Sequence, residues 1–246
     1  MFNYHKTLNL ILALAFFVSC TENTVDENDI IKSSDIIKTS LTISENGKFH
    51  NEAILSILDK NEFIDPQITT GEVLKLMYNE MSSKYPNKFH TTDLSTLSQV
   101  FDFNQKYSDF KFDIEYYESL KAKAAKKNIN EDVLKFLDQA FYERKITEKE
   151  FAALDAKTGS SNFQIEIFKS YFEASEILWT QDVEKTFKIN PTAKCDAASQ
   201  VIIADAVGGT LIGILTGGAG GPLGGGAVSL AVRQAQIEEY GGGCID

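Results

Sequence analysis

The sequence predicts an all-α protein, and three observations lead to that fold class. Apolar residues recur at helical spacing from Phe49 to Phe187, a pattern typical of amphipathic helices. Glycines recur at every fourth position in the uncharged run from Ala206 to Val232, which is the spacing of one helix face. No stretch alternates apolar and polar residues between hairpin turns, as a half-buried strand would. At 246 residues, the chain is long enough to bury a sizeable core in one or two domains.

The composition is acidic. The chain has 24 Lys and Arg residues against 35 Asp and Glu residues, which gives a formal net charge of −11. Nucleic-acid-binding proteins normally present a basic face, so we expect no nucleic-acid partner. The same balance argues against simple electrostatic adhesion to anionic lipid.

Residues 1–19 have the features of a signal peptide. Lys6 supplies a positive charge, and the apolar stretch from Leu8 to Val18 is too short for a stable membrane span. The segment runs into Ser19-Cys20, which resembles the lipobox of bacterial lipoproteins, although Phe17 stands where that family usually has Leu. The resemblance implies that Cys20 is lipidated and becomes the first residue of the mature protein, held to a membrane by its lipid chains. An ordinary secretory signal peptide is the alternative.

Residues 20–47 are expected to form a disordered acidic tether. The stretch from Thr21 to Asp29 is polar and acidic, and Ser, Thr and Asn remain frequent up to Gly47. Such a composition buries too little apolar surface to fold. An acidic stretch directly after the lipidated cysteine resembles the surface-export signals of Bacteroidota-type lipoproteins. That resemblance implies an outer-membrane lipoprotein of the cell envelope, either surface-exposed or facing the periplasm; a plain spacer is the alternative role.

Residues 48–190 are expected to form a helical domain. The expected apolar helix faces are Phe49–Leu58, Val73–Met81, Leu94–Phe101, Ile114–Ala124, Val133–Phe141, Phe151–Leu154 and Phe163–Leu178. Several of these faces follow a Thr or Asn that can cap a helix, and in capping boxes a Glu stands three residues later. These caps are Thr69 with Glu72, the run Thr91–Asp93, Asn130, and Thr147 with Glu150.

Residues 191–246 are expected to form a helical hairpin. Gly209, Gly213, Gly217, Gly221 and Gly225 would form one stripe without side chains on a helix, and such a stripe lets a second helix approach closely. The sequence from Ala219 to Pro222 combines Gly and Pro and predicts the turn of the hairpin.

The predicted turn lies midway between two pairs of residues. It would bring Cys195 beside Cys244 at the open end of the hairpin and Asp205 beside Arg233 as an ion pair. Of the three cysteines, Cys20 is assigned to lipid, and an even remainder in an oxidising compartment predicts one disulfide. Free or metal-binding thiols are the alternative, but the mature chain offers only two histidines, far apart in sequence.

The hairpin resembles the glycine-zipper hairpins of envelope lipoproteins of the surface-antigen type and of membrane-active bacteriocins. The resemblance covers about residues 201–240 and depends on the five glycines of the stripe. In those families the zipper serves envelope integrity or membrane permeabilisation. The helical region resembles no family of known activity.

The sequence contains no recognisable catalytic motif. His50 is followed by Asn51-Glu52 without a second His one helical turn away, so no zinc-protease motif is present, and there is no Gly-x-Ser-x-Gly elbow. Gly218-x-Gly220 lacks the third glycine of a dinucleotide-binding loop. We therefore expect no enzyme activity, no cofactor and no metal, and interpret His50 as a residue that caps or flanks its helix.

Three alternatives remain open for the hairpin. It could pack on itself and on the helical domain, insert into a bilayer, or use the glycine stripe to pair with another protein or a second copy. The expected function is that of a lipid-anchored envelope protein with a non-catalytic binding or structural role. The alternative function is a membrane-active toxin or bacteriocin-like antibacterial factor that acts through the hairpin.

Overall fold

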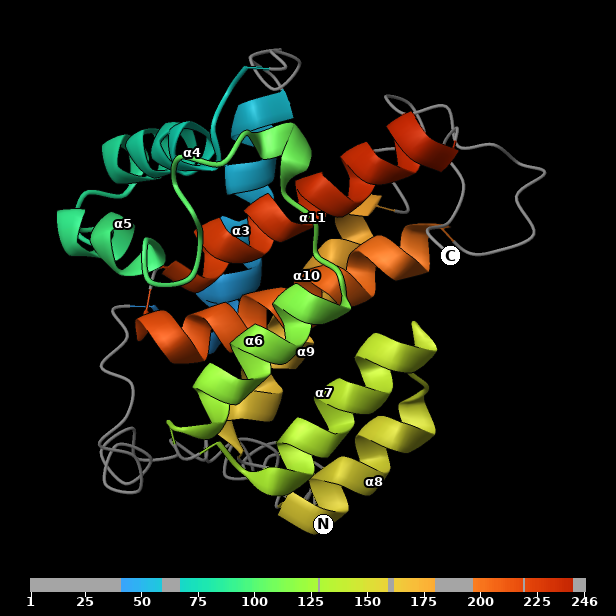
Figure 1. The fold of residues 1–246 in the computed structure, drawn as a ribbon. Helices are drawn as coiled ribbons and strands as arrows, with labels where there is room; N and C mark the ends of the chain where they lie inside the picture. Colours follow the sequence, from blue (N-terminus) through green and yellow to red (C-terminus); the bar gives the residue numbers. More distant parts are fainter. Residues whose placement is uncertain are drawn as a thin grey trace, which may run out of the picture. The chain divides into compact units, whose positions relative to one another are not determined.

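The computed structural model describes residues 41–58, 67–127, 129–158, 162–179, 197–218 and 220–240. The expected all-α class is confirmed, because these residues form helices and contain no strand beyond one isolated bridge between Thr69 and Lys106. The α-helices are α3 (Ile43–Leu58), α4 (Thr70–Lys84), α5 (Thr91–Leu97), α6 (Ile114–Ala125), α7 (Glu131–Glu143), α8 (Glu148–Thr158), α9 (Phe163–Ile177), α10 (Ala197–Thr216) and α11 (Gly220–Tyr240), and η2 (Tyr107–Asp109) is a short 3-10 helix (Figure 1).

The expected caps of three helices are confirmed. Thr69 and Glu72 form a reciprocal capping box at the start of α4. The Asn130 side chain accepts a hydrogen bond from the backbone N–H of Asp132 and begins α7. At α8, Glu150 accepts hydrogen bonds from the backbone N–H and hydroxyl of Thr147. Local sequence signals therefore place these helix starts correctly.

The first of the described helices, α3, begins earlier than the sequence predicts. The predicted tether extends to Gly47, whereas α3 starts at Ile43, and Asn46 and Gly47 are buried. The physical reason is a local cap, since the backbone N–H of Thr42 donates to the Glu45 carboxylate at 2.8 Å. The tether is predicted from amino-acid composition, and composition does not detect a local capping pattern such as Thr-x-x-Glu. The start of α3 also packs against α9, where the Gly47 N–H donates to the Ser170 hydroxyl at 3.0 Å.

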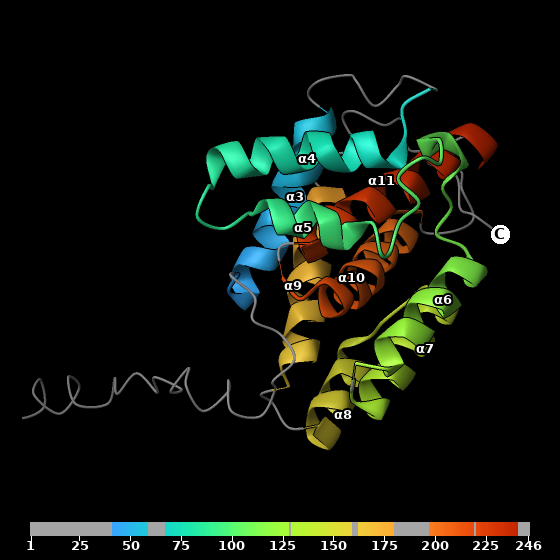
Figure 2. The same ribbon diagram turned by 60° about the vertical axis from the view of Figure 1, so that its left-hand side comes forward.

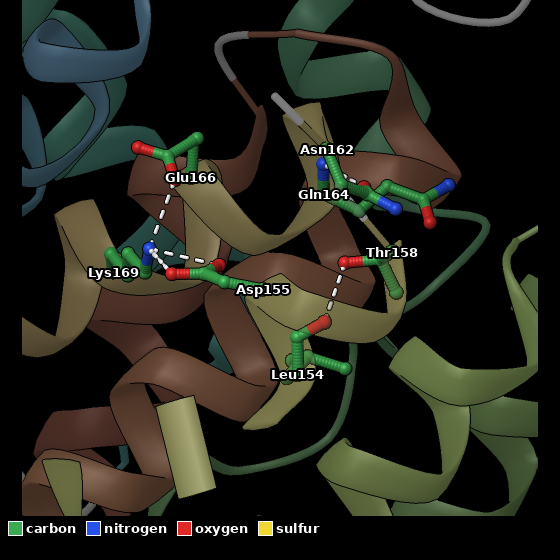
Figure 3. A network of polar contacts seen from close by, with 7 residues as sticks. All are labelled: Leu154, Asp155, Thr158, Asn162, Gln164, Glu166 and Lys169. Carbon is green, nitrogen blue, oxygen red and sulfur yellow. Dashed lines mark hydrogen bonds and ion pairs between the residues drawn. The ribbon is translucent and has the colours of Figure 1, made fainter. Parts of the chain in front are cut away.

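Side-chain contacts near the α8–α9 connection join the two helices (Figure 3). Asn162 caps α9 by accepting a hydrogen bond from the Gln164 N–H. Lys169 of α9 reaches Asp155 of α8 at 2.9 Å and Glu166 of its own helix at 3.1 Å. Partial burial works against the charged form of Lys169, but these two carboxylates leave its pKa above the ordinary value. The pair α8–α9 is thus fixed by partly buried polar contacts as well as by its apolar faces.

Helices α10 and α11 lie among the other helices of the unit formed by residues 36–246. Figures 1 and 2 show them between α4 and α5 on one side and α6 and α7 on the other. α10 contacts α5, α6, α7 and α9, and α11 contacts α3, α4, α5 and η2. The sequence leaves open whether the hairpin beyond residue 190 packs on the helical domain, and these contacts place α10 and α11 in the same compact unit as the preceding helices.

The core of this unit is centred on the two C-terminal helices. Every residue of α10 from Gln200 to Ile214 is buried, as is every residue of α11 from Gly220 to Arg233. A helix that is apolar on all sides is stable in water only when other elements cover it. Here the apolar faces of α3, α4, α6, α7 and α9 supply that cover, through side chains such as Ile54, Met77 and Tyr171.

Candidate functional site

The glycines of α10 and α11 bring the two backbones into direct contact. A Cβ atom added at Gly225 would lie 2.9 Å from the Cα of Gly209, and one added at Gly221 would lie 3.0 Å from the Cα of Gly213. No larger residue fits such a distance without moving one helix away from the other. Four of the five residues in the predicted stripe therefore lie at the contact between the two helices.

The fifth residue of the stripe, Gly217, has a different role. It adopts φ of 71°, and its N–H donates to the carbonyl of Gly213 at 2.9 Å, directly after α10 ends at Thr216. A left-handed residue at this position is the usual way to end a helix, and glycine adopts it without a Cβ penalty. An added Cβ at Gly217 would meet no atom within 4 Å. The prediction that Gly217 packs between helices is wrong.

The turn lies earlier than predicted. The sequence predicts it from Ala219 to Pro222, but α11 already begins at Gly220 and includes Pro222 in its first turn. Proline is tolerated there because the first N–H groups of a helix have no intrahelical acceptor. Gly209 faces Gly225 and Gly213 faces Gly221, so the register of the hairpin is centred on Gly217.

This register separates Asp205 from Arg233, and the predicted ion pair between them is wrong. Arg233 lies one helical turn beyond the position of α11 that faces Asp205 across the hairpin, and its guanidinium donates to Gln236 at 2.9 Å. Within the described residues, the basic side chain beside Asp205 is His50, whose Nε2 lies 3.5 Å from Oδ2 of the carboxylate.

Asp205 is the centre of a buried polar cluster. Its Oδ2 accepts hydrogen bonds from the Ser175 hydroxyl at 2.6 Å and from the Trp179 indole N–H at 2.9 Å. His50, Ser175 and Asp205 have no exposed surface, and Trp179 is 2% exposed. The cluster joins α3, which carries His50, to the C-terminal part of α9 and to the middle of α10.

A second layer of side chains holds His50 in place. Its Nδ1 lies 3.0 Å from Oδ1 of Asn51, and the Asn51 amide donates to the carbonyl of Ala174 at 2.8 Å. The Tyr171 ring meets the imidazole edge-to-face with a centroid distance of 5.6 Å, and its hydroxyl donates to Asn46 at 3.2 Å. Burial raises the pKa of Tyr171 well above its ordinary value, so its hydroxyl stays protonated.

Ser175, His50 and Asp205 do not form the arrangement of a hydrolytic triad. A nucleophilic serine must donate to the histidine that accepts its proton, and the carboxylate must orient that histidine from the other side. Here the Ser175 hydroxyl donates to Asp205 itself, and none of these three side chains has exposed surface. The chemistry that this geometry supports is the fixing of buried charge and helix position, not attack on a substrate.

Further hydrogen bonds join the first turn of α10 to the last part of α11. The Gln236 side chain donates to the carbonyl of Ala197 at 2.9 Å and to Gln200 at 3.2 Å, and Arg233 donates to Gln236. These side chains are buried or nearly so. The start of α10 therefore lies against the last part of α11.

A recess on the surface of the described residues is also lined by polar groups. Its volume is about 380 Å³, and its lining consists of Asp109, Lys111, Asp113 and Glu115 together with polar and aromatic neighbours. Asp113 is already used as the cap of α6, where it accepts a hydrogen bond from the Tyr116 N–H. Within the described ranges, no group of three or more His, Cys, Asp or Glu side chains is placed to hold a metal ion.

The three cysteines of the predicted lipid and disulfide sites, Cys20, Cys195 and Cys244, lie outside the described residues. Sequence reasoning missed His50, Ser175 and Trp179 as parts of one cluster. One signal was present: His50 shares its helix face with Ile54 and Ile57, at spacings of four and seven, which indicates a buried histidine and not one at a helix end. The second signal was Asp205, a lone charge within an apolar run.

Comparison of the chain with known protein families, with curated proteins and with solved structures finds no match. A function for this chain therefore has to be inferred from the geometry of the cluster and of the hairpin, together with the sequence.

Proposed function

We propose that this protein is a lipid-anchored protein of the bacterial cell envelope with a non-catalytic binding or structural role. The observation that carries the proposal is the position of α10 and α11 at the centre of the domain, with their glycines turned toward each other. Such an arrangement supports the first of the three alternatives for the hairpin, in which it packs on itself and on the preceding helices. The hairpin then serves as the core of a domain displayed on the envelope.

The lipid anchor is supported by the sequence before the domain. Lys6, the apolar stretch to Val18 and the Ser19-Cys20 step resemble a lipoprotein signal, and α3 begins at Ile43. Lipid chains on Cys20 would hold the chain at an outer membrane, and the residues between Cys20 and Ile43 would act as the tether.

The proposed disulfide between Cys195 and Cys244 has indirect structural support. The Gln236 side chain donates to the carbonyl of Ala197, which lies two residues after Cys195 in sequence. Cys244 follows the end of α11 at Tyr240 by four residues, three of them glycine. The start of α10 thus lies against Gln236 of α11, and the proposal is that the glycine segment after Tyr240 brings the two sulfur atoms together.

Mass spectrometry of the mature protein recovered from its native envelope tests the whole proposal. We expect the first residue to be Cys20 carrying lipid, and a peptide that links Cys195 to Cys244 until it is reduced. An unmodified Cys20 in a protein that retains residues 1–19 would contradict the anchor. Alkylation of both late cysteines without prior reduction would contradict the disulfide while leaving the anchor intact.

A membrane-active toxin or antibacterial factor is the second candidate, and one observation favours it. Among the described helices, α10 alone is long and apolar enough to cross a membrane, with 20 residues and a mean hydropathy of 1.6 over its most apolar window. However, 83% of that window is buried by the protein, so the helix would have to leave its present contacts. Release of dye from liposomes at micromolar protein would support this candidate, and intact liposomes would remove it.

A further inference from the structure

Asp205 is an unusual residue for its position. It is the only charged residue of α10, lies at the middle of that helix and has no exposed surface. Its Oδ2 accepts two hydrogen bonds, while Oδ1 accepts none from the described residues. An ionised carboxylate in such surroundings is costly unless a positive charge lies beside it.

The protonation of His50 Nδ1 follows from the neighbouring amide. Because the Nδ2 group of Asn51 donates to the carbonyl of Ala174, its Oδ1 is the atom that faces His50. An amide oxygen can only accept a hydrogen bond, so Nδ1 of His50 must carry the hydrogen. In a neutral imidazole the other nitrogen would then be bare.

An Nε2 without a hydrogen does not fit its neighbour, which is the carboxylate of Asp205. This atom lies 3.5 Å from Oδ2 of Asp205, so a neutral histidine would place a lone pair against a buried carboxylate. A proton on Nε2 replaces that repulsion with charge attraction across 3.5 Å, although Nε2 makes no hydrogen bond within the described residues. The hydrogen bonds from Ser175 and Trp179 stabilise the ionised form of the carboxylate, which favours the proton on the histidine.

We infer that His50 is doubly protonated in the folded protein and forms with Asp205 a buried ion pair, which clasps α10 to α3 and α9. The clasp exists only while the carboxylate is ionised and the imidazole carries its second proton. It is a conformational device, separate from the lipid anchor and the disulfide, because none of its residues belongs to either.

The other ionisable groups around the pair do not compete for this proton. Tyr171 of α9 faces the imidazole, and the charge of Asp205 acts on the hydroxyl of Tyr107 in η2. Burial raises the pKa of both tyrosines well above the ordinary value, and the charge of Asp205 adds to the effect at Tyr107. Both phenols therefore stay neutral, and His50 is the cation that balances Asp205.

Nitrogen-15 NMR of the full folded chain tests the protonation state directly. At pH 7 we expect both ring nitrogens of His50 to resonate as protonated nitrogens, with the exposed His90 as an internal reference. In Asp205→Asn, which keeps the shape but removes the charge, Nε2 of His50 should move to the range of a bare nitrogen. A bare Nε2 in the unmodified protein overturns the inference, and this holds even if the variant does not fold.

A double-mutant cycle tests whether the pair acts as a clasp. His50→Gln leaves a buried carboxylate without its cation and should raise the unfolding equilibrium constant by on the order of a hundredfold. Adding Asp205→Asn to His50→Gln removes the remaining charge and should recover part of that loss. Strictly additive losses would overturn the clasp.

Discussion

Single glycines of the α10–α11 contact differ sharply in what they tolerate, although their spacing in the sequence is uniform. A Cβ at Gly213 would be 3.7 Å from the nearest backbone atom of α11, which is ordinary van der Waals contact. A Cβ at Gly225 would be 2.9 Å from the Cα of Gly209, a backbone atom that cannot move without its helix. The close approach thus depends on particular glycines and not on the stripe as a whole.

We predict opposite outcomes for alanine at these two sites. Gly225→Ala should lower the free energy of unfolding by about 1–3 kcal/mol, because α10 and α11 must separate to admit the methyl group. Gly213→Ala should be neutral or should stabilise the protein by up to about 1 kcal/mol, since alanine is the better helix former. Denaturant unfolding of the two variants side by side measures both values. Equal losses at the two sites would show that the close contact lies elsewhere.

The sequence could not separate these glycines, because a four-residue period places them all on one face. Gly217 belongs to the same period but ends α10 in a left-handed conformation, a role set by where the chain turns. Similarly, the sequence predicts an ion pair between Asp205 and Arg233, because they have opposite charges and almost the same midpoint as the two cysteines. The observed register is centred on Gly217 instead and separates them. The basic side chain that does lie beside Asp205, His50, comes from α3, which no register of the hairpin predicts.

At the scale of helices, the caps explain where most elements begin. Thr69, Asn130 and Thr147 each hold the first turn of a helix through a side-chain hydrogen bond. At α8 the cap carries a charge, because the Glu150 carboxylate accepts hydrogen bonds from the hydroxyl and N–H of Thr147. These hydrogen bonds lower the pKa of Glu150 below its ordinary value of 4.5.

The start of α8 should therefore weaken in acid. A lowered pKa in the folded state means that the cap adds stability above pH 4.5 and loses it as the pH falls through the folded value. We expect the backbone N–H of Thr147 to lose its hydrogen-exchange protection below that range. In Glu150→Gln the same N–H should show no such pH dependence. Unchanged protection in the unmodified chain at acid pH would contradict the role of the carboxylate.

Helix existence and capping were predictable because both depend on residues within a few positions of one another. The early start of α3 was missed because the Thr42–Glu45 cap lies in a segment whose composition is that of a tether. Asn46 and Gly47 are buried only because α9 lies against them, as the Gly47 to Ser170 hydrogen bond shows. A sequence read locally cannot supply a partner that follows more than a hundred residues later.

At the scale of the whole molecule, the C-terminal helices complete the core of the helices before them. The sequence leaves open whether the apolar faces of residues 48–190 pack on the hairpin, and several of them do pack on α10 and α11. Ile54 and Met77 lie beside Gly226, and Tyr171 lies against Gly209 and Gly221. Periodicity identifies an apolar face but not the element that covers it, so the sequence alone could not choose among the three alternatives for the hairpin.

This architecture predicts that the helical region cannot fold without its last two helices. A chain ending at residue 190 would leave Ile54, Met77 and Tyr171 without their partners in α10 and α11. It should lose the whole free energy of unfolding, typically about 5–15 kcal/mol for a domain, and should show no cooperative thermal transition by circular dichroism. A matched chain that begins at residue 41 and keeps the C-terminus should still melt cooperatively. If the chain ending at residue 190 also melts cooperatively, the hairpin is an accessory and not the core.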